Sequence, residues 1–140
     1  MSHSFRVEAT PDRLPEANAG LDAWWVSAGL PDDARFAFEL VLEEMFMNVV
    51  MHGSLPEGPP CVVEVSLEVV GDSVVMGIAD NGLPFDPLAM ENPDTAAPME
   101  ERRVGGLGVY LVREMMDSVR YQHIESRNHL IVSKRLVSPE

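Results

Sequence analysis

Residues 36–52, FAFELVLEEMFMNVVMH, constrain the fold more than any other stretch of the chain. The stretch contains neither Gly nor Pro, and Pro31, Asp32 and Asp33 stand just before it, where a first helical turn is expected. It therefore predicts a helix over residues 32–52, ended by Gly53. This helix is apolar on most sides, which is typical of a buried helix. Its apolar residues include Phe36, Phe38, Leu40, Val41, Met45, Met47, Val49 and Val50.

One polar stripe interrupts this apolar surface. Glu44, Asn48 and His52 follow one another at four-residue spacing, so each is displaced by only about 40° around the helix axis. A buried carboxylate or amide costs several kcal/mol unless it is paired. Two interpretations stay open: the stripe caps neighbouring backbone or faces solvent, or it lines a cavity that admits a charged ligand and a metal. Glu43 points about 100° away from the stripe, so the spacing to Asn48 selects Glu44.

The length and composition indicate one globular domain over residues 1–140. The hydrophobic content of 46% argues against disorder, and the net charge of -13 argues against direct binding of nucleic acid. We expect a soluble, cytoplasmic protein, because the chain shows neither a signal peptide nor an apolar run long enough to span a membrane. The single cysteine, Cys61, is interpreted as a small apolar residue at the start of a strand.

Hydrophobic periodicity predicts the remaining elements. Strands are expected at residues 4–9, 61–70 and 73–79, the last ending at Asp80, with a final hairpin of 119–124 and 130–136 around a turn at 126–128. Further helices are expected at 13–28, stopped by Gly29, and at 106–117. Of the Trp24–Trp25 pair, one ring should face the core and the other should be half covered. The predicted fold class is α/β (α+β): a two-layer sandwich of a mainly antiparallel sheet with three helices on one face.

A long segment over residues 81–104 separates the two halves of the predicted sheet. It holds four prolines and little periodicity, and it is acidic up to Arg102 and Arg103. A loop of this length inside a compact domain is typically a functional lid or a disordered segment. We interpret it as a lid.

Two glycine-bearing segments flank this lid. Asp80 ends a hydrophobic strand, where its carboxylate could accept a hydrogen bond from an exocyclic amine. Gly82 would let a planar ring approach the backbone. The alternative is that these residues form an ordinary Asn-Gly turn. The segment 105–109, GGLGV, opens a helix and would expose N–H groups to a phosphate, unless it is only a hinge. It matches neither a Walker motif nor a Rossmann fingerprint.

The order of these motifs resembles that of the GHKL ATP-binding superfamily, which has the Bergerat fold and includes gyrase B and the catalytic domains of histidine kinases. More closely, the chain resembles the stand-alone anti-sigma-factor serine kinases. The resemblance covers about residues 4–136. It is carried by Glu44-x-x-x-Asn48-x-x-x-His52, Asp80-Asn81-Gly82-x-Pro84-Phe85-Asp86-Pro87, the proline-rich lid, Gly105-Gly106-Leu107-Gly108-x-Tyr110-Leu111-Val112 and Met116-Asp117.

The resemblance implies ATP or ADP with Mg²⁺ as cofactors, and it implies a role for each motif. Glu44 would be the general base, Asn48 would ligate Mg²⁺, and Asp80 would bind the adenine amine in a pocket shaped by Gly82. The segment Gly105, Gly106, Leu107 and Gly108 would cradle the phosphates. Arg103 or its neighbour Arg102 would neutralise γ-phosphate charge, or would form a solvated pair. His52 is expected to pack against the lid or a loop.

The function implied is that of an anti-sigma factor and serine-protein kinase in a partner-switching pathway. Its phosphoryl acceptor would be a serine of a STAS-domain anti-sigma-factor antagonist, its second partner would be a sigma factor, and it would form a homodimer. The alternative is a catalytically weak or inactive module that binds nucleotide and sequesters a regulatory partner. A ligand-binding domain without nucleotide would require the conjunction of motifs to be accidental.

Overall fold

The computed structural model describes residues 2–54, 58–84 and 112–136 of the chain. Five strands and two long helices make up the described part: β1 (Ser2–Glu8), α1 (Leu14–Ser27), α2 (Arg35–His52), β2 (Val62–Val70), β3 (Ser73–Asp80), β4 (Ser118–Ile124) and β5 (Arg127–Arg135). Single turns of 3-10 helix, η1 (Pro11–Arg13) and η2 (Asp32–Ala34), precede the two helices. Residues 112–115 are also helical and form the described part of the predicted third helix.

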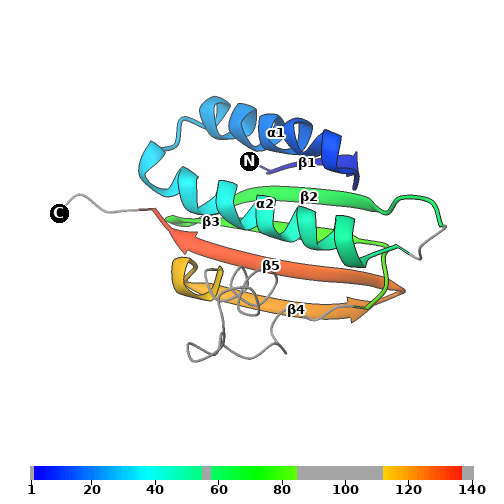
Figure 1. The fold of residues 1–140 in the computed structure, drawn as a ribbon. Helices are drawn as coiled ribbons and strands as arrows, with labels where there is room; N and C mark the ends of the chain where they lie inside the picture. Colours follow the sequence, from blue (N-terminus) through cyan, green and yellow to red (C-terminus); the bar gives the residue numbers. More distant parts are fainter. Residues whose placement is uncertain (1, 55–57, 85–111, 137–140) are drawn as a thin grey trace, which may run out of the picture.

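The five strands form one sheet in the order β1-β2-β3-β5-β4, and every neighbouring pair is antiparallel. Both long helices lie against the same face of this sheet (Figure 1). Val112 and Met116, at the end of the third helix, belong to the same buried core. The predicted fold class, a two-layer α+β sandwich with an antiparallel sheet and helices on one face, is therefore confirmed.

The core fills the space between the helices and the sheet. Alternate residues of β2 and β3 point into it, because successive side chains of a strand face opposite sides of a sheet. These residues are Val63, Val65, Leu67, Val74, Met76 and Ile78, all at most 4% exposed. The helices contribute Trp25, Phe38 and Phe46, each fully buried. Burying one side chain of this kind contributes about 1.5–3 kcal/mol, so this layer stabilises the frame that holds the site.

One expectation about aromatic burial was wrong. Trp24 and Trp25 are both buried, at 4% and 0% exposure, and their rings meet edge to face. The indole of Trp25 can be buried because it donates a 2.9 Å hydrogen bond to the Pro31 carbonyl oxygen. Conversely, Phe36 is 64% exposed. It lies two residues before the buried Phe38, about 200° away around the helix, and therefore faces outward.

The turn of the final hairpin also differs from its prediction. Glu125 and Ser126 form the turn, with φ values of 55° and 64°, and β5 already begins at Arg127. Two successive left-handed residues are what a two-residue hairpin needs to match the twist of its strands. The predicted turn at residues 126–128 was misplaced because Asn128 is a common turn residue and Glu125 is not. Asn128 instead lies in β5, paired with Asp80 of β3.

The third helix ends two residues earlier than predicted, at residue 115. Asp117 instead bridges to β5: its backbone N–H donates to the Ser133 carbonyl oxygen over 2.8 Å, and its carboxylate accepts from the Arg135 N–H. Lys134 adds a hydrogen bond to the Met115 carbonyl oxygen. These contacts hold the end of the helix on the last strand.

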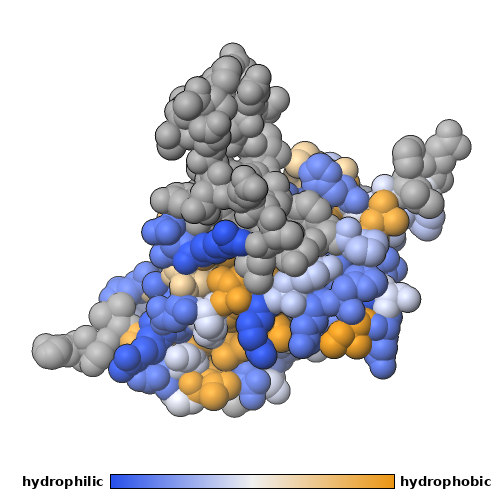
Figure 2. Space-filling view, turned by 90° about the horizontal axis from the view of Figure 1, so that it is seen from below, coloured by the Kyte–Doolittle hydropathy of each residue, from blue (hydrophilic) through white to orange (hydrophobic). Residues whose placement is uncertain are grey.

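The two edge strands carry polar side chains. Arg6 and Glu8 are exposed on β1, and Arg120, Gln122 and His123 are exposed on β4. Seen from the β4 side, hydrophilic and hydrophobic side chains are interspersed over the described surface (Figure 2). Charged edges of this kind disfavour pairing with another sheet. Among the helices that the structure describes, none has the length and apolar character needed to cross a membrane.

Candidate functional site

Asn48 is the one polar residue that α2 buries, and it is only 5% exposed. Its position on the helix puts its amide toward the sheet, among Met45, Val49 and Ile78. Within the described residues, its side-chain nitrogen has no hydrogen-bond partner. A buried donor without a partner costs about 1–3 kcal/mol. An amide kept at that cost marks a place where a ligand or a water would complete the hydrogen bonding.

Glu44 lies one turn before Asn48 on the same helix and is half-buried, whereas Glu43 is exposed. This agrees with the register that the spacing of the stripe predicts. Burial raises the pKa of Glu44, and the nearby charge of Glu43 raises it further. A carboxylate with a raised pKa is a stronger proton acceptor than an ordinary one. Glu44 is therefore suited to act as a base, although it does not line the small cavities described below.

Asp80 ends β3 and is 7% exposed. Its Oδ1 atom accepts two hydrogen bonds, one from the Gly82 backbone N–H at 2.8 Å and one from Asn128 Nδ2 at 3.0 Å. None of the hydrogen bonds made by the described residues reaches its Oδ2 atom. The carboxylate is thus fixed by one oxygen, and the other is available to a donor from a ligand.

Asn128 is a site residue that sequence reasoning missed. It is 5% exposed on β5, and besides Asp80 its Nδ2 donates to the Leu83 carbonyl oxygen at 2.9 Å. Its Oδ1 accepts a hydrogen bond from the Tyr121 hydroxyl. The hairpin register could have found it, because Asn128 is directly opposite Asp80 once the turn is placed at Glu125 and Ser126.

Asn48, Asp80 and Asn128 come together around two small cavities. The first, of about 30 Å³, is also lined by Met45, Val49, Ile78, Tyr121 and Leu130. The second, of about 20 Å³, adds His52, Gly53 and Leu83. A water molecule occupies about 30 Å³ of the liquid, so neither cavity admits a nucleobase unless its walls separate. Of the predicted stripe, Asn48 and His52 border a cavity and Glu44 does not, and the admission of a charged ligand and a metal stays a prediction.

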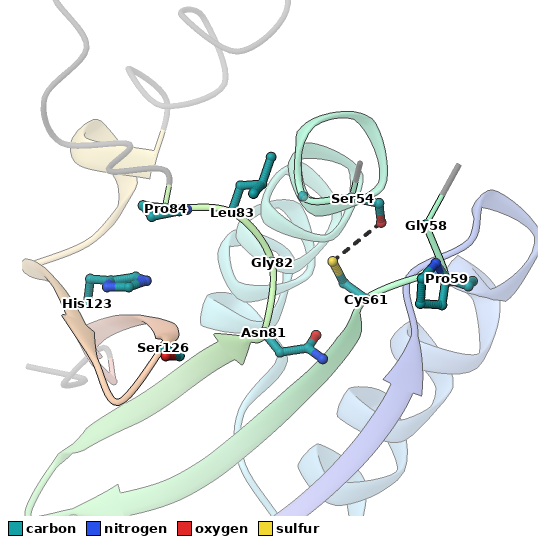
Figure 3. Close-up of a pocket in the computed structure, with 12 residues that line it drawn as sticks. Ser54, Gly58, Pro59, Cys61, Asn81, Gly82, Leu83, Pro84, His123 and Ser126 are labelled. Carbon is teal, nitrogen blue, oxygen red and sulfur yellow. Dashed lines mark hydrogen bonds between the residues drawn. The ribbon is translucent and has the colours of Figure 1, made fainter. Parts of the chain in front are cut away.

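A larger hollow of about 420 Å³ lies beside these cavities and shares Gly53 and Leu83 with the second of them. Its size falls in the range of about 300–1,000 Å³ that is usual for ligand pockets. Figure 3 shows Ser54 and Cys61 pointing toward each other at one end, with Sγ and Oγ 3.4 Å apart, and His123 and Ser126 at the other. Asn48 and Asp80 do not line this hollow. We place the candidate site at the three buried polar residues, Asn48, Asp80 and Asn128, because the volume of a hollow does not by itself indicate what it binds.

The glycine at position 82 has a structural reason in addition to the expected one. A Cβ there would lie 2.8 Å from the Gly53 carbonyl oxygen and 2.9 Å from its Cα atom. The missing side chain therefore makes room for the end of α2, and the approach of a planar ring stays a prediction. Gly82 still belongs to the site, because its N–H holds Asp80.

Several predicted site residues lie outside the described residues: Arg103, Gly105, Gly106, Leu107, Gly108 and the lid beyond Pro84. Within residues 2–54, 58–84 and 112–136, no group of three or more His, Cys, Asp or Glu side chains could hold a metal ion. A Mg²⁺ ion that took one oxygen from Asn48 and its others from phosphates and waters would need no such group. The donor set therefore fits magnesium delivered with a nucleotide.

The fold and the site together define a two-layer α+β ligand-binding domain with buried polar groups at the end of β3. The chain belongs to the family described as the histidine kinase-like ATPase domain, which matches residues 7–134. This confirms the resemblance to the GHKL superfamily.

Two curated relatives are informative. The serine/threonine-protein kinase BtrW of Bordetella bronchiseptica is 32% identical over 99 residues, covering 71% of this chain and 69% of BtrW. The serine-protein kinase RsbW of Listeria monocytogenes is 24% identical over 128 residues, covering 87% of this chain and 80% of RsbW.

Solved structures share the fold. The RsbU and RsbW domains of Rv1364c from Mycobacterium tuberculosis match 99% of this chain with a TM-score of 0.70 at 17% identity. This chain spans only about a third (33%) of that longer protein. The catalytic domain of the histidine kinase ThkA matches with a TM-score of 0.55 at 14% identity, over 99% of both chains. At these identities the two structures support the fold alone.

Proposed function

We propose that this protein is an ATP-dependent serine-protein kinase and anti-sigma factor of a partner-switching pathway. Its substrate would be a serine of a STAS-domain anti-sigma-factor antagonist, and its other partner a sigma factor or an equivalent regulator. Membership of an ATPase family and the kinase names of its relatives support the class of activity. We further propose that residues 1–140 act as one domain, as a cytoplasmic homodimer.

The observation that carries the proposal is the meeting of Asn48 and Asp80 at one cavity wall. Each side chain is buried and each has a polar atom that no described residue engages, Asn48 Nδ2 and Asp80 Oδ2. Buried polar atoms are normally hydrogen-bonded, so an unpaired Asn48 nitrogen beside a carboxylate oxygen that no described donor engages is best explained by a polar ligand. A nucleotide offers both an amine and phosphate oxygens.

Each residue of the site would have a separate role in binding the nucleotide. Asp80 Oδ2 would accept a hydrogen bond from the adenine amine. The Asn48 oxygen would ligate Mg²⁺ and its nitrogen would donate to a ligand oxygen. Gly105, Gly106, Leu107 and Gly108 would supply backbone N–H groups to the phosphates, and Arg103 would offset their charge. When bound, Mg-ATP supplies the phosphoryl group.

Glu44 would accept the proton of the attacking serine hydroxyl. Phosphoryl transfer requires positioned oxygens, charge neutralisation and a base, with little covalent participation by the protein. The raised pKa of Glu44 supports this role, because burial makes the carboxylate a better proton acceptor.

The test combines calorimetry with a transfer assay. Mg-ATP should bind and raise Tm, and labelled ATP should transfer phosphate to a STAS-domain protein but not to its Ser→Ala variant. Absence of binding heat and of any Tm shift at saturating nucleotide would refute the proposal, because ligand at 100 times Kd stabilises a protein by about 2.7 kcal/mol. Binding without transfer would instead support the alternative, a nucleotide-gated module that sequesters a partner.

A further inference from the structure

We propose that Asn128 sets the nucleobase specificity of this site by occupying one oxygen of Asp80, so that the carboxylate selects adenine over guanine. This inference rests on the proposed nucleotide-binding function. Asn128 acts through Asp80 and is a positioning residue rather than one that touches the base.

The two purines differ in what they offer to a carboxylate. Adenine presents a single exocyclic amine beside an acceptor nitrogen. Guanine presents two neighbouring donors, a ring N–H and an amine, on the same edge. A carboxylate with both oxygens free can accept two parallel hydrogen bonds, and such bidentate pairs are the strong and specific ones. An unrestrained Asp80 would therefore suit guanine at least as well as adenine.

The structure removes this second acceptor. Gly82 N–H and Asn128 Nδ2 donate to Oδ1 of Asp80 at 2.8 and 3.0 Å. A carboxylate oxygen has about two lone-pair sites, so these two donors saturate it. Oδ2 then remains as a single acceptor, which matches the single amine of adenine.

Tyr121 fixes the orientation of the Asn128 amide. The Tyr121 hydroxyl donates to Asn128 Oδ1, which leaves the amide nitrogen facing Asp80 Oδ1 and the Leu83 carbonyl oxygen. A flipped amide would place its oxygen against the Asp80 carboxylate and would lose both of these bonds. Because Asn128 and Asp80 are both buried, each hydrogen bond is stronger than it would be in water.

A purely structural role for Asn128 makes a different prediction. Through Leu83, Asn128 also holds the segment after β3, so its loss would loosen the site. Loosening alone would weaken ATP and GTP to a similar degree. The ratio of the two dissociation constants therefore separates a specificity role from a structural one.

The experiment measures Kd for Mg-ATP and Mg-GTP by calorimetry in the wild type, Asn128→Ala and Tyr121→Phe. Asn128→Ala should lower the ratio Kd(GTP)/Kd(ATP) by about tenfold, the equivalent of one hydrogen bond to a charged group. Tyr121→Phe should shift the ratio in the same direction by a smaller factor, because the amide is then free to flip. Ser133→Ala is the control: it removes another β4–β5 hydrogen bond, Ser118 Oγ to Ser133 Oγ, on the opposite face of the sheet.

The outcomes distinguish the two proposals. A wild-type protein that binds neither nucleotide overturns the proposed function and this inference with it. A wild type that prefers ATP, together with an unchanged ratio in Asn128→Ala, overturns the inference alone. Should Asn128→Ala fail to fold, Tyr121→Phe becomes the deciding variant. A ratio Kd(GTP)/Kd(ATP) in Tyr121→Phe that equals the ratio in Ser133→Ala overturns the inference.

Discussion

Gly82 lies so close to Gly53 that a Cβ at position 82 would stand 2.8 Å from the Gly53 carbonyl oxygen. The same carbonyl oxygen accepts a 2.8 Å hydrogen bond from the Leu83 N–H. The end of α2 and the segment after β3 are thus packed backbone against backbone. Because Asn48 lies on α2 and Asp80 ends β3, this contact sets the distance between the two halves of the site.

Gly82→Ala should therefore destabilise the protein. Overpacking a close contact costs about 1–3 kcal/mol, and here the obstacle is backbone that cannot rotate away. We expect a lower Tm, measured by scanning calorimetry, and weaker nucleotide binding. Gly71→Asn is the control, since Gly71 has a φ of 61°, which Asn tolerates, and nothing lies within 4 Å of its Cβ position. Equal Tm values for Gly82→Ala and the wild type would contradict the packing argument.

Asp80→Asn should weaken ATP binding by roughly 10- to 100-fold, on the scale of a hydrogen bond to a charged group. The donors Gly82 N–H and Asn128 Nδ2 would keep the oxygen of the new amide, so its NH₂ group would face the adenine amine, donor against donor.

Calorimetry with Mg-ATP measures this effect. Asp72→Asn serves as the control: it removes one negative charge at an exposed carboxylate paired with Arg135, away from the cavity. If both variants lost affinity equally, net charge rather than base recognition would be the cause.

The sequence predicted the half of the site that its local patterns determine. Four-residue spacing put Glu44 and Asn48 on one stripe of a helix, and the end of a hydrophobic run located Asp80. Asn128 could not be found in this way, because its role depends on strand register, which a displaced turn had shifted. A register error moves every side chain of a strand relative to its partner.

Burial of single side chains was also beyond the reach of local patterns. Trp24 and Trp25 are both buried, although among the described residues only the Trp25 indole has an acceptor, the Pro31 carbonyl oxygen. The close contact of Gly82 with Gly53 at the end of α2 was likewise absent from the local pattern. Both results come from tertiary packing, which periodicity does not encode.

The pH dependence of stability should show the contact between α1 and α2. The pKa of Glu39 is raised to about 6. A hydrogen bond with Asp22, burial of the carboxyl group and the negative charges of Asp22 and Asp32 raise it, whereas the positive charge of Arg35 lowers it. A carboxyl whose pKa is raised by folding contributes stability that is present below its unfolded pKa and is lost as the pH rises through about 6.

Glu39→Gln should remove this dependence, because Gln resembles the protonated acid. Its Tm should exceed that of the wild type at pH 7.5 and approach it at pH 4.5, as measured by scanning calorimetry. Glu68→Gln, at an exposed carboxylate of β2, is the control and should show no such gain. A Tm gain for Glu39→Gln that is the same at both pH values would refute the assignment.

The last prediction separates catalysis from binding on α2. Glu44→Gln preserves shape while removing the basic lone pair, so transfer to the acceptor serine should fall by roughly 10²–10⁴-fold. Its ATP affinity should change little or rise, because a carboxylate near a triphosphate is repulsive. Asn48→Ala should instead weaken both Mg²⁺-dependent binding and transfer, because it removes a metal ligand.

Glu43→Gln is the matched control for Glu44→Gln, since it makes the same change at the neighbouring, exposed position. It should leave binding and transfer unchanged. All three variants are assayed for Tm, for ATP affinity with and without Mg²⁺, and for phosphorylation of a STAS-domain protein. If the stripe were only structural, activity would be lost in step with Tm. Undiminished transfer by a folded Glu44→Gln variant would remove the base from the mechanism and leave a nucleotide-binding module.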